Sequence, residues 1–322
     1  MNRREEMKIL DAIKNRTPKK YNLNGKIIKV KSEQETKTTA SSVITFIFLT
    51  IYALSLVLLL LWALMTSFKS QGDFRVNIVG LPQQFEWNYG FVFDQFKYEV
   101  FFEGYGKVGI SVGYMFLYSV LYAGGCAIVK AMTTCLTAYC CARYRYKFGR
   151  VVTFLVILAM TMPIVGALPA EIHLAKSLGL YDSIIGQYVM KMNFLGMYYL
   201  VFFAMFKSVP KEFDEAAKID GAGDFTIMVK VVLPTIVPTL LTVTLLTFIG
   251  FWNDYQVPLI YLPHYPTISQ GLQRMINTNL NGLSTVPMRM TASMIVLIPI
   301  LTIFIIFQKS LMGNVTIGGV KG

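Results

Sequence analysis

Four adjacent side chains inside an apolar stretch carry groups that suit the binding of a polyol. Trp252, Asn253, Asp254 and Tyr255 lie toward one end of a long run of hydrophobic residues. An indole face can stack on a sugar ring while amide and carboxylate oxygens pair with its hydroxyl groups. A structural role for the same residues is the alternative, and the sequence leaves both interpretations open.

Three titratable side chains lie inside other apolar stretches, where such groups are rare and usually face a cavity or a partner. Glu171 and His173 come close after the helix-breaking Pro163 and Pro169, so they could line a solute pathway or a gate, or lock two interfacial loops together. Lys130 could contact a solute, although we favour a pair with an acid on a partner subunit. Because the apolar stretches otherwise hold almost no Lys or Arg, we expect a neutral or weakly charged solute.

A different kind of polar segment, EFDEAAKIDGAG at 212–223, separates two strongly apolar stretches. Glu212, Asp214 and Glu215 place negative charge in a first helical turn, where the helix dipole favours it. Gly221 supplies a left-handed stop. The segment therefore predicts one short helix.

One face of this predicted helix combines an aromatic residue with small ones. Phe213 lies three and four positions before Ala216 and Ala217, so we expect all three on one side, open to close approach by another protein. Asp224 is expected to cap the next helix, and Pro234 marks the entry to the following apolar run. The alternative is an amphipathic helix lying on the membrane surface, which the neighbouring lysines would favour.

The elements that must position these groups are membrane helices. The 322-residue chain is 54% hydrophobic and only 15% charged, unlike an ordinary soluble domain. Crossing a bilayer takes about 20 helical residues, and six windows are long and apolar enough. They are 43–68, 114–141, 151–175, 184–206, 236–260 and 290–311. We therefore predict an all-α, polytopic membrane protein with six transmembrane helices.

Positive charges indicate which connections stay in the cytoplasm. Lys and Arg are concentrated in the N-terminal tail, in the connection at 142–150 and in the connection at 207–230. An even number of spans then places both termini in the cytoplasm. This topology and contact with membrane lipid explain the net charge of +12 better than nucleic acid does, because no aromatic and basic binding surface for it is visible.

The same pattern divides the chain into a tail and a membrane domain. Residues 1–40 are predicted to form a basic cytoplasmic tail, and 41–322 the transmembrane domain. Within that domain, 69–110 is an aromatic-rich external segment expected to form a small cap, and 207–234 is a cytoplasmic connection. The four cysteines lie in or beside the second predicted span without metal-ligand spacing, so we expect unpaired thiols and no metal site.

The spacing of the cytoplasmic connection resembles the EAA loop of ABC importer permeases. That motif reads E-A-A, three residues, G, nine residues, I, one residue, L-P. The matching residues here are Glu215, Ala216, Ala217, Gly221, Val231, Leu233 and Pro234, with Val231 in place of the usual Ile.

Further blocks resemble the carbohydrate branch of this family, specifically the smaller permease subunit of maltose-transport-type importers. They are NIVGLPQQFEWNYGFVF, LTAYCCARYRYKFGR, FWNDYQVPLIYLPHYPTISQGL and FQKSLMGNVTIGGVKG. The chain departs from this branch in its long basic tail and in Cys140 and Cys141, where small or apolar residues are usual.

The resemblance implies one subunit of a larger ATP-driven importer of a sugar or oligosaccharide. A second permease subunit would complete a heterodimer, two ATP-binding cassette subunits would bind ATP and Mg, and an external solute-binding protein would deliver the solute. The EAA helix would seat in a groove of an ATPase subunit. The seated or supporting residues would be Phe213, Glu215, Ala216, Ala217, Asp220, Gly221, Leu233 and Pro234.

The chain is therefore not expected to be an enzyme or to hold a cofactor. It contains no G-x-x-x-x-G-K-[ST] phosphate-binding loop, so ATP hydrolysis is assigned to the partner. The alternatives are a permease for a non-sugar nutrient, a secondary transporter, for which no inverted repeat of broken helices is visible, and a passive membrane scaffold.

Overall fold

The fold is described from a computed structural model, which covers residues 20–21, 27–28, 40–144, 147–162, 166–277 and 282–315. The chain divides into two units, Met1–Leu59 and Leu60–Gly322. The first contains the antiparallel strands β1 (Lys20–Tyr21) and β2 (Ile27–Ile28) and most of helix α2 (Ala40–Thr66). The rest of the predicted tail at 1–40 lies outside the described residues.

Four helices are long and apolar enough to cross a membrane among the described residues. They are Ser41–Thr66 within α2, Val112–Arg143, Asp224–Asn253 and Val286–Gln308. The second is helix α5. The third runs through α11 (Asp224–Thr226), the π-helix η1 (Ile227–Val232) and α12 (Leu233–Asn253), and the fourth begins α15 (Val286–Val315). These helices confirm the first, second, fifth and sixth predicted windows as apolar spans by length and composition.

The third and fourth predicted windows are not long continuous helices, so the structure does not confirm them as spans. The third contains α6 (Lys147–Thr161) and α7 (Leu168–Ser177), and the fourth contains α8 (Ile184–Met190) and α9 (Met197–Ser208). Pro169 lies in the first turn of α7, where proline is tolerated because it needs no upstream hydrogen-bond partner. Gly196 precedes α9 at φ 139°, a conformation that interrupts a helix.

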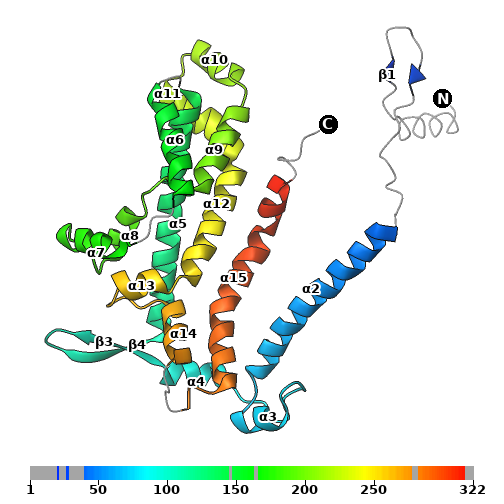
Figure 1. The fold of residues 1–322 in the computed structure, drawn as a ribbon, viewed down its shortest axis with the longest axis vertical. Coiled ribbons are helices and arrows are strands. Elements are labelled where there is room, and N and C mark those ends of the chain that lie inside the picture. The colour runs from blue at the N-terminus through cyan, green and yellow to red at the C-terminus, as the bar shows by residue number, and fades with distance from the viewer. Residues whose placement is uncertain are drawn as a thin grey trace, which may run out of the picture. The chain divides into compact units, whose positions relative to one another are not determined.

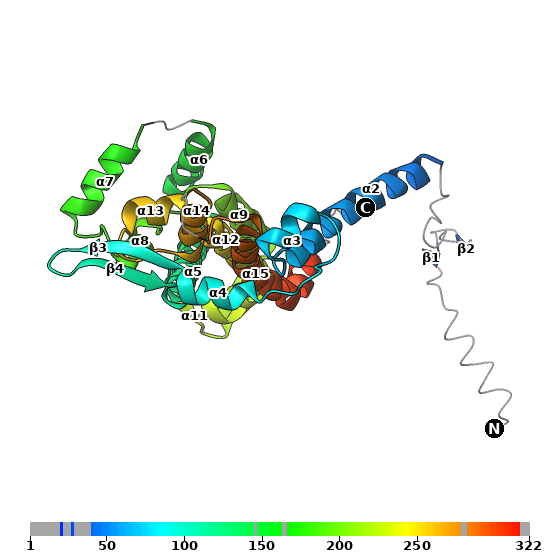
Figure 2. The same cartoon turned by 90° about the horizontal axis from the view of Figure 1, so that it is seen from below.

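The centre of the second unit is a group of four helices, α5, α9, α12 and α15. α5 packs against both α9 and α12, and α15 packs against α12 (Figures 1 and 2). The buried side chains between α5, α6, α9 and α12 include Tyr139, Val156, Phe202, Phe206 and Ile236. Burial of these apolar groups holds the helices together at a fixed spacing.

The 69–110 segment folds into a small aromatic-rich structure of two short helices and a hairpin. It forms α3 (Gln71–Val76), α4 (Asn88–Gln95), and the hairpin of β3 (Lys97–Phe102) and β4 (Gly106–Ser111), in which Lys97 pairs with Ser111. Val92, Phe96 and Val100 join one buried cluster with residues of α5, α14 (Ile268–Asn277) and α15. Figure 1 shows this structure at one end of α5, while α10 (Glu212–Ile219) lies at the other end.

Candidate functional site

The segment at 212–223 forms the predicted short helix with a defined stop. α10 ends at Ile219, Asp220 is its C-cap, and Gly221 has φ +80°. The N–H of Gly221 donates to the carbonyl of Lys218 over 3.0 Å, and the N–H of Ala222 donates to the carbonyl of Ala217 over 2.9 Å. These two bonds are a Schellman motif, which requires a left-handed residue at the position of Gly221.

The side chains of α10 point mainly outward. None of its eight residues is buried, and Phe213, Glu215 and Ala216 are exposed. Ala217, by contrast, is partly buried and packs with Ala222 against the cluster that contains Phe206. The expectation that both alanines share the face of Phe213 is therefore only half right, because Ala217 anchors the helix and Ala216 is presented to solvent.

α10 joins the long helix α12 through a buried connection. Ile227 and Val232 of η1 are buried, Leu233 packs against the same cluster, and Pro234 is exposed in the first turn of α12. Asp224 does not cap α11 as predicted, since the N-cap is Gly223; its carboxylate lies 3.3 Å from the ammonium group of Lys218. Movement of α10 would therefore reach α12 through packed side chains.

Arg143 provides a second connection, which the sequence indicated only as part of the excess of positive charge at 142–150. Its side chain is 4% exposed and lies at the end of α5. Its Nη1 donates to the carbonyl of Val209 over 2.7 Å and to that of Phe206 over 3.3 Å, and its Nη2 lies 2.5 Å from a carboxylate oxygen of Asp214. One guanidinium thus ties α10 to α5 and α9.

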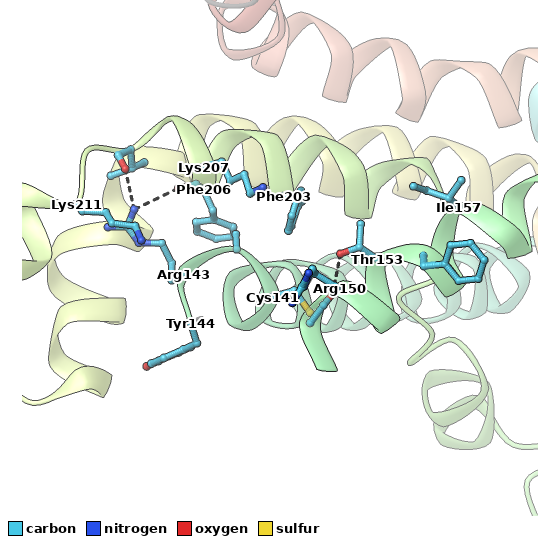
Figure 3. Close-up of a pocket in the computed structure, with 14 residues that line it drawn as sticks. Cys141, Arg143, Tyr144, Arg150, Thr153, Ile157, Phe203, Phe206, Lys207 and Lys211 are labelled. Carbon is cyan, nitrogen blue, oxygen red and sulfur yellow. Dashed lines mark hydrogen bonds between the residues drawn. The ribbon is translucent and has the colours of Figure 1, made fainter. Parts of the chain in front are cut away.

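A cavity of about 800 Å³ lies beside this guanidinium, between the end of α5, α6 and α9 (Figure 3). Thr153 of α6 crosses toward α9, because its hydroxyl is 2.9 Å from that of Tyr199. Arg150, Lys207 and Lys211 lie along the cavity together with Arg143. The sequence marked these cations as an excess of charge on one side of the membrane and did not predict a cavity.

The Trp252–Tyr255 stretch lies at the other end of α12. Trp252 is 1% exposed, and its Nε1 donates to the carbonyl of Val296 over 3.1 Å. Phe116 and Phe248 pack against its ring. With both faces in the core, Trp252 has no surface for a sugar, so the structural alternative accounts for this residue.

The three residues that follow Trp252 have separate surroundings. Asn253 donates to the carbonyl of Ile249. Asp254 is the C-cap of α12 and precedes Tyr255, the N-cap of α13 (Gln256–Tyr261). One of its carboxylate oxygens accepts the N–H groups of the first two residues of α13 over 2.9 and 3.1 Å. Tyr255 lines a cavity of about 250 Å³ together with polar side chains of β3 and α14. The four residues do not form one site.

The structure also separates Glu171 from His173. A carboxylate oxygen of Glu171 accepts a hydrogen bond from the hydroxyl of Tyr261 over 3.3 Å, which connects α7 to α13. His173, on the same helix, is exposed. The contact of Glu171 is of the kind expected for a lock between two segments.

Lys130 lies near the middle of α5 and lines a cavity of about 300 Å³. Thr134 and the segment from Phe194 to Tyr199 form the other walls. That segment includes the break between α8 and α9, and irregular backbone at membrane depth is tolerated where it lines a cavity or is buried in protein. Lys130 therefore lines a cavity next to the irregular backbone between α8 and α9.

An ionic cluster that the sequence did not indicate joins three segments at the end that holds the hairpin. The Nδ1 of His264 contacts a carboxylate oxygen of Asp182, and its Nε2 lies 2.9 Å from the carbonyl oxygen of Phe101. Asp182 adopts φ +54° and also accepts the N–H of His264. The hydrogen bond to Asp182 and, to a lesser degree, the one to Phe101 raise the pKa of His264 against the opposing effect of burial.

Comparison with known protein families identifies the family of this chain. Residues 133–315 match the family described as binding-protein-dependent transport system inner membrane component. The chain belongs to this family. This inner membrane component is therefore a multi-pass membrane subunit of an ABC-type transport system, and the predicted membership among ABC importer permeases is confirmed.

Individual relatives extend the match over most of the chain. This component is 24% identical to the diacetylchitobiose uptake system permease protein NgcG of Streptomyces coelicolor, over 84% of this chain and 86% of that protein. It is 24% identical to the melibiose/raffinose/stachyose import permease protein MelC of Bacillus subtilis, over 80% and 89% of the two chains.

A solved structure shows the same fold. A crystal structure of a bacterial ABC transporter involved in the import of the acidic polysaccharide alginate contains a chain that superposes with a TM-score of 0.70 at 22% identity. The match covers 86% of this inner membrane component and 98% of that chain.

Proposed function

We propose that this component is a permease subunit through which an ATP-driven importer moves a sugar or oligosaccharide into the cytoplasm. The observation that carries the proposal is α10, which exposes Phe213, Glu215 and Ala216 and is fixed to α5 by Arg143 and to α12 by η1. A helix that presents its side chains and is rigidly tied to two long helices is suited to receive a movement and pass it on.

In this proposal the partners are those that the EAA resemblance implies. Two ATP-binding cassette subunits hydrolyse ATP with Mg, and a groove of one of them holds α10. A second permease subunit completes the pathway, and an external solute-binding protein delivers the solute. The chain itself holds neither cofactor nor catalytic group, and its termini lie in the cytoplasm.

The six-span arrangement belongs to the same proposal. The apolar segments Phe148–Thr161 and Met197–Ser208 complete the count together with the four long helices. Both are short, and the irregular segment before the second, which includes Phe194 and Gly196, forms part of the inner wall of the pathway. The domain division follows, with a tail at 1–40, a membrane domain at 41–322, an external segment at 69–110 and a coupling connection at 207–234.

The sugar assignment rests on the names of relatives that match at least four-fifths of this chain, which import diacetylchitobiose and melibiose, raffinose or stachyose. Among the pathway candidates, we assign contact with the solute to Lys130 and Tyr255, since both line cavities. Asn253, Asp254, Glu171 and His173 then bound the pathway or its gates. A permease for a non-sugar nutrient is the second candidate.

The decisive experiment is purification of the whole complex from its native membrane, followed by ATPase assays with the binding protein and a panel of sugars. An associated ATPase and second permease, with hydrolysis stimulated by one class of sugar, would support the proposal and identify the solute. A folded chain recovered without any ATPase would refute the assignment of α10, and stimulation only by a non-sugar would refute the substrate class.

A further inference from the structure

The cavity beside Arg143 has two chemically different ends. Its polar end is formed by Arg143, Arg150, Lys207 and Lys211, and its apolar end by side chains deeper along α6 and α9 (Figure 3). At about 800 Å³, it falls in the size range of small-molecule sites. Nothing in the proposed transport cycle uses it.

Of the four cations at the polar end, one has an ion-pair partner among the described residues and three do not. Arg143 is committed to Asp214 and to two carbonyls. Arg150, Lys207 and Lys211 have no ion pair within the part of the chain that the structure describes. The ammonium group of Lys207 lies 4.6 Å from the centre of the Phe203 ring, a contact that leaves its positive charge unneutralised. The polar end therefore favours an anion.

On both α6 and α9, a cation of the polar end and the aromatic side chain of the apolar end lie one helical turn apart. On α6, Arg150, Phe154 and Ile157 are four and then three residues apart, so they lie on one face with the cation at its start. On α9, Phe203 precedes Lys207 by one turn. Because both Phe154 and Ile157 are exposed, at 62% and 47%, the apolar end offers a hydrophobic surface that a soluble anion would not cover.

We propose that this cavity is a binding site for an anionic glycerophospholipid. The phosphate contacts Arg150, Lys207 and Lys211, and an acyl chain lies against Phe154, Ile157 and Phe203. Basic pockets between membrane helices at the cytoplasmic surface suit such headgroups, and an acyl chain explains the order of side chains from cation to apolar. A lipid seated here would brace α6 against α9 beside the Arg143 link, so its occupancy would influence how firmly α10 is held.

The test uses the assembled transporter, purified and reconstituted in lipid nanodiscs made from equal parts of phosphatidylcholine and phosphatidylglycerol. Phosphatidylglycerol that stays bound after detergent extraction is counted by native mass spectrometry. We expect the combined variant Arg150→Gln, Lys207→Gln, Lys211→Gln to retain less of it, by about fivefold for each charge removed. Lys230→Gln is the matched control, since Lys230 is exposed on η1 and does not line the cavity.

A second variant separates a lipid from a soluble anion. Ile157→Trp fills the apolar end and leaves every cation in place, so it should lower phosphatidylglycerol retention as well. If it does not, and inorganic phosphate displaces the bound anion, the cavity binds a free anion and the proposal is wrong.

Two further outcomes would also overturn the proposal. One is unchanged retention in the combined variant. The other is loss of an ATPase subunit from that variant with its lipid count unchanged, which would mean that the cations contact protein. These readouts do not depend on which solute is transported, so failure here is distinguishable from failure of the proposed function.

Discussion

The two ends of the helix α12 use polar and aromatic residues in opposite ways. At one end α10 exposes Phe213, and its conformation is set by two backbone hydrogen bonds and the left-handed Gly221. At the other end Trp252 is fully buried and donates its N–H to the carbonyl of Val296. An aromatic residue next to carboxylates therefore does not by itself indicate a binding surface. The surrounding fold decides whether its ring is exposed, as in Phe213, or buried in the core, as in Trp252.

The largest effect is expected at Gly221, the left-handed residue that ends α10 and so fixes the direction in which this helix projects. Gly221→Val should abolish solute-stimulated ATP hydrolysis without preventing membrane insertion, because a β-branched residue at φ +80° carries a strain of about 1–3 kcal/mol and would redirect α10. The measurement is ATPase activity of the reconstituted complex with and without solute.

Gly223→Val is the matched control for this turn. Gly223 has φ −71° and an added Cβ there would meet no atom within 4 Å, so coupling should be kept. Normal coupling in Gly221→Val as well would mean that the left-handed stop is not needed to hold α10 in place.

The next effect tests the link between α10 and α5. Arg143→Met keeps the length of the side chain but leaves Asp214 and the carbonyl of Val209 without their donor. Removal of one partner of a largely buried ion pair costs about 3 kcal/mol, so we expect a lower melting temperature and a large loss of stimulated ATPase activity.

The companion variant for this link is Arg143→Met with Asp214→Leu, which removes both charges. It should regain melting temperature but not coupling, because α10 would remain unattached to α5. If the double variant couples normally, the link contributes stability alone.

The third effect separates a packed aromatic residue from a solute contact. Trp252→Leu should destabilise the protein by about 3 kcal/mol, through the cavity created and the carbonyl of Val296 left without its donor. The KM for solute should stay unchanged in the protein that remains folded. A raised KM with an unaltered melting temperature would instead restore Trp252 as a sugar contact.

Residues close together in the sequence were enough to predict the helix α10, but they could not predict its contacts with distant parts of the chain. The acidic first turn and Gly221 are neighbours in sequence, so their effects combine within one helix. The inward position of Ala217 depends on the cluster around Phe206, and the link from Arg143 to Asp214 spans 71 residues. Such pairs leave no periodic trace in a single sequence.

Four of the six predicted spans are confirmed as long apolar helices, and the other two are not, for a related reason. Apolar runs identify the four long helices because length and composition suffice there. The window at 184–206 contains no proline, yet α8 ends at Met190 and α9 begins only after Gly196. A glycine alone does not show whether its positive φ is used, since that depends on the neighbouring helices.

A smaller effect is expected from a single exposed charge on α10. Glu215→Lys should reduce copurification of the ATPase severalfold. An exposed ion pair contributes about 0.2–1 kcal/mol, and the reversed charge would both remove this attraction and add a repulsion of similar size. Glu212→Lys serves as the control, because Glu212 lies in the same first turn and is also exposed. Equal ATPase recovery from wild type and Glu215→Lys would remove Glu215 from the docking surface.

The smallest effect is expected at the end opposite α10, where the charged form of His264 is the one that is stabilised. Protonated His264 can donate to both Asp182 and the carbonyl of Phe101, whereas neutral imidazole has only one N–H. The pKa of His264 is raised by these bonds, so their stabilisation is complete below the unfolded pKa of about 6.5 and is lost as the pH rises through the folded value. The melting temperature of wild type should therefore fall between about pH 6 and pH 8 by more than that of His264→Gln.

His173→Gln is the control, because it removes the other histidine of the chain and should leave the wild-type pH dependence of the melting temperature in place. If His264→Gln also leaves this pH dependence unchanged, the cluster does not hold the hairpin to its neighbours.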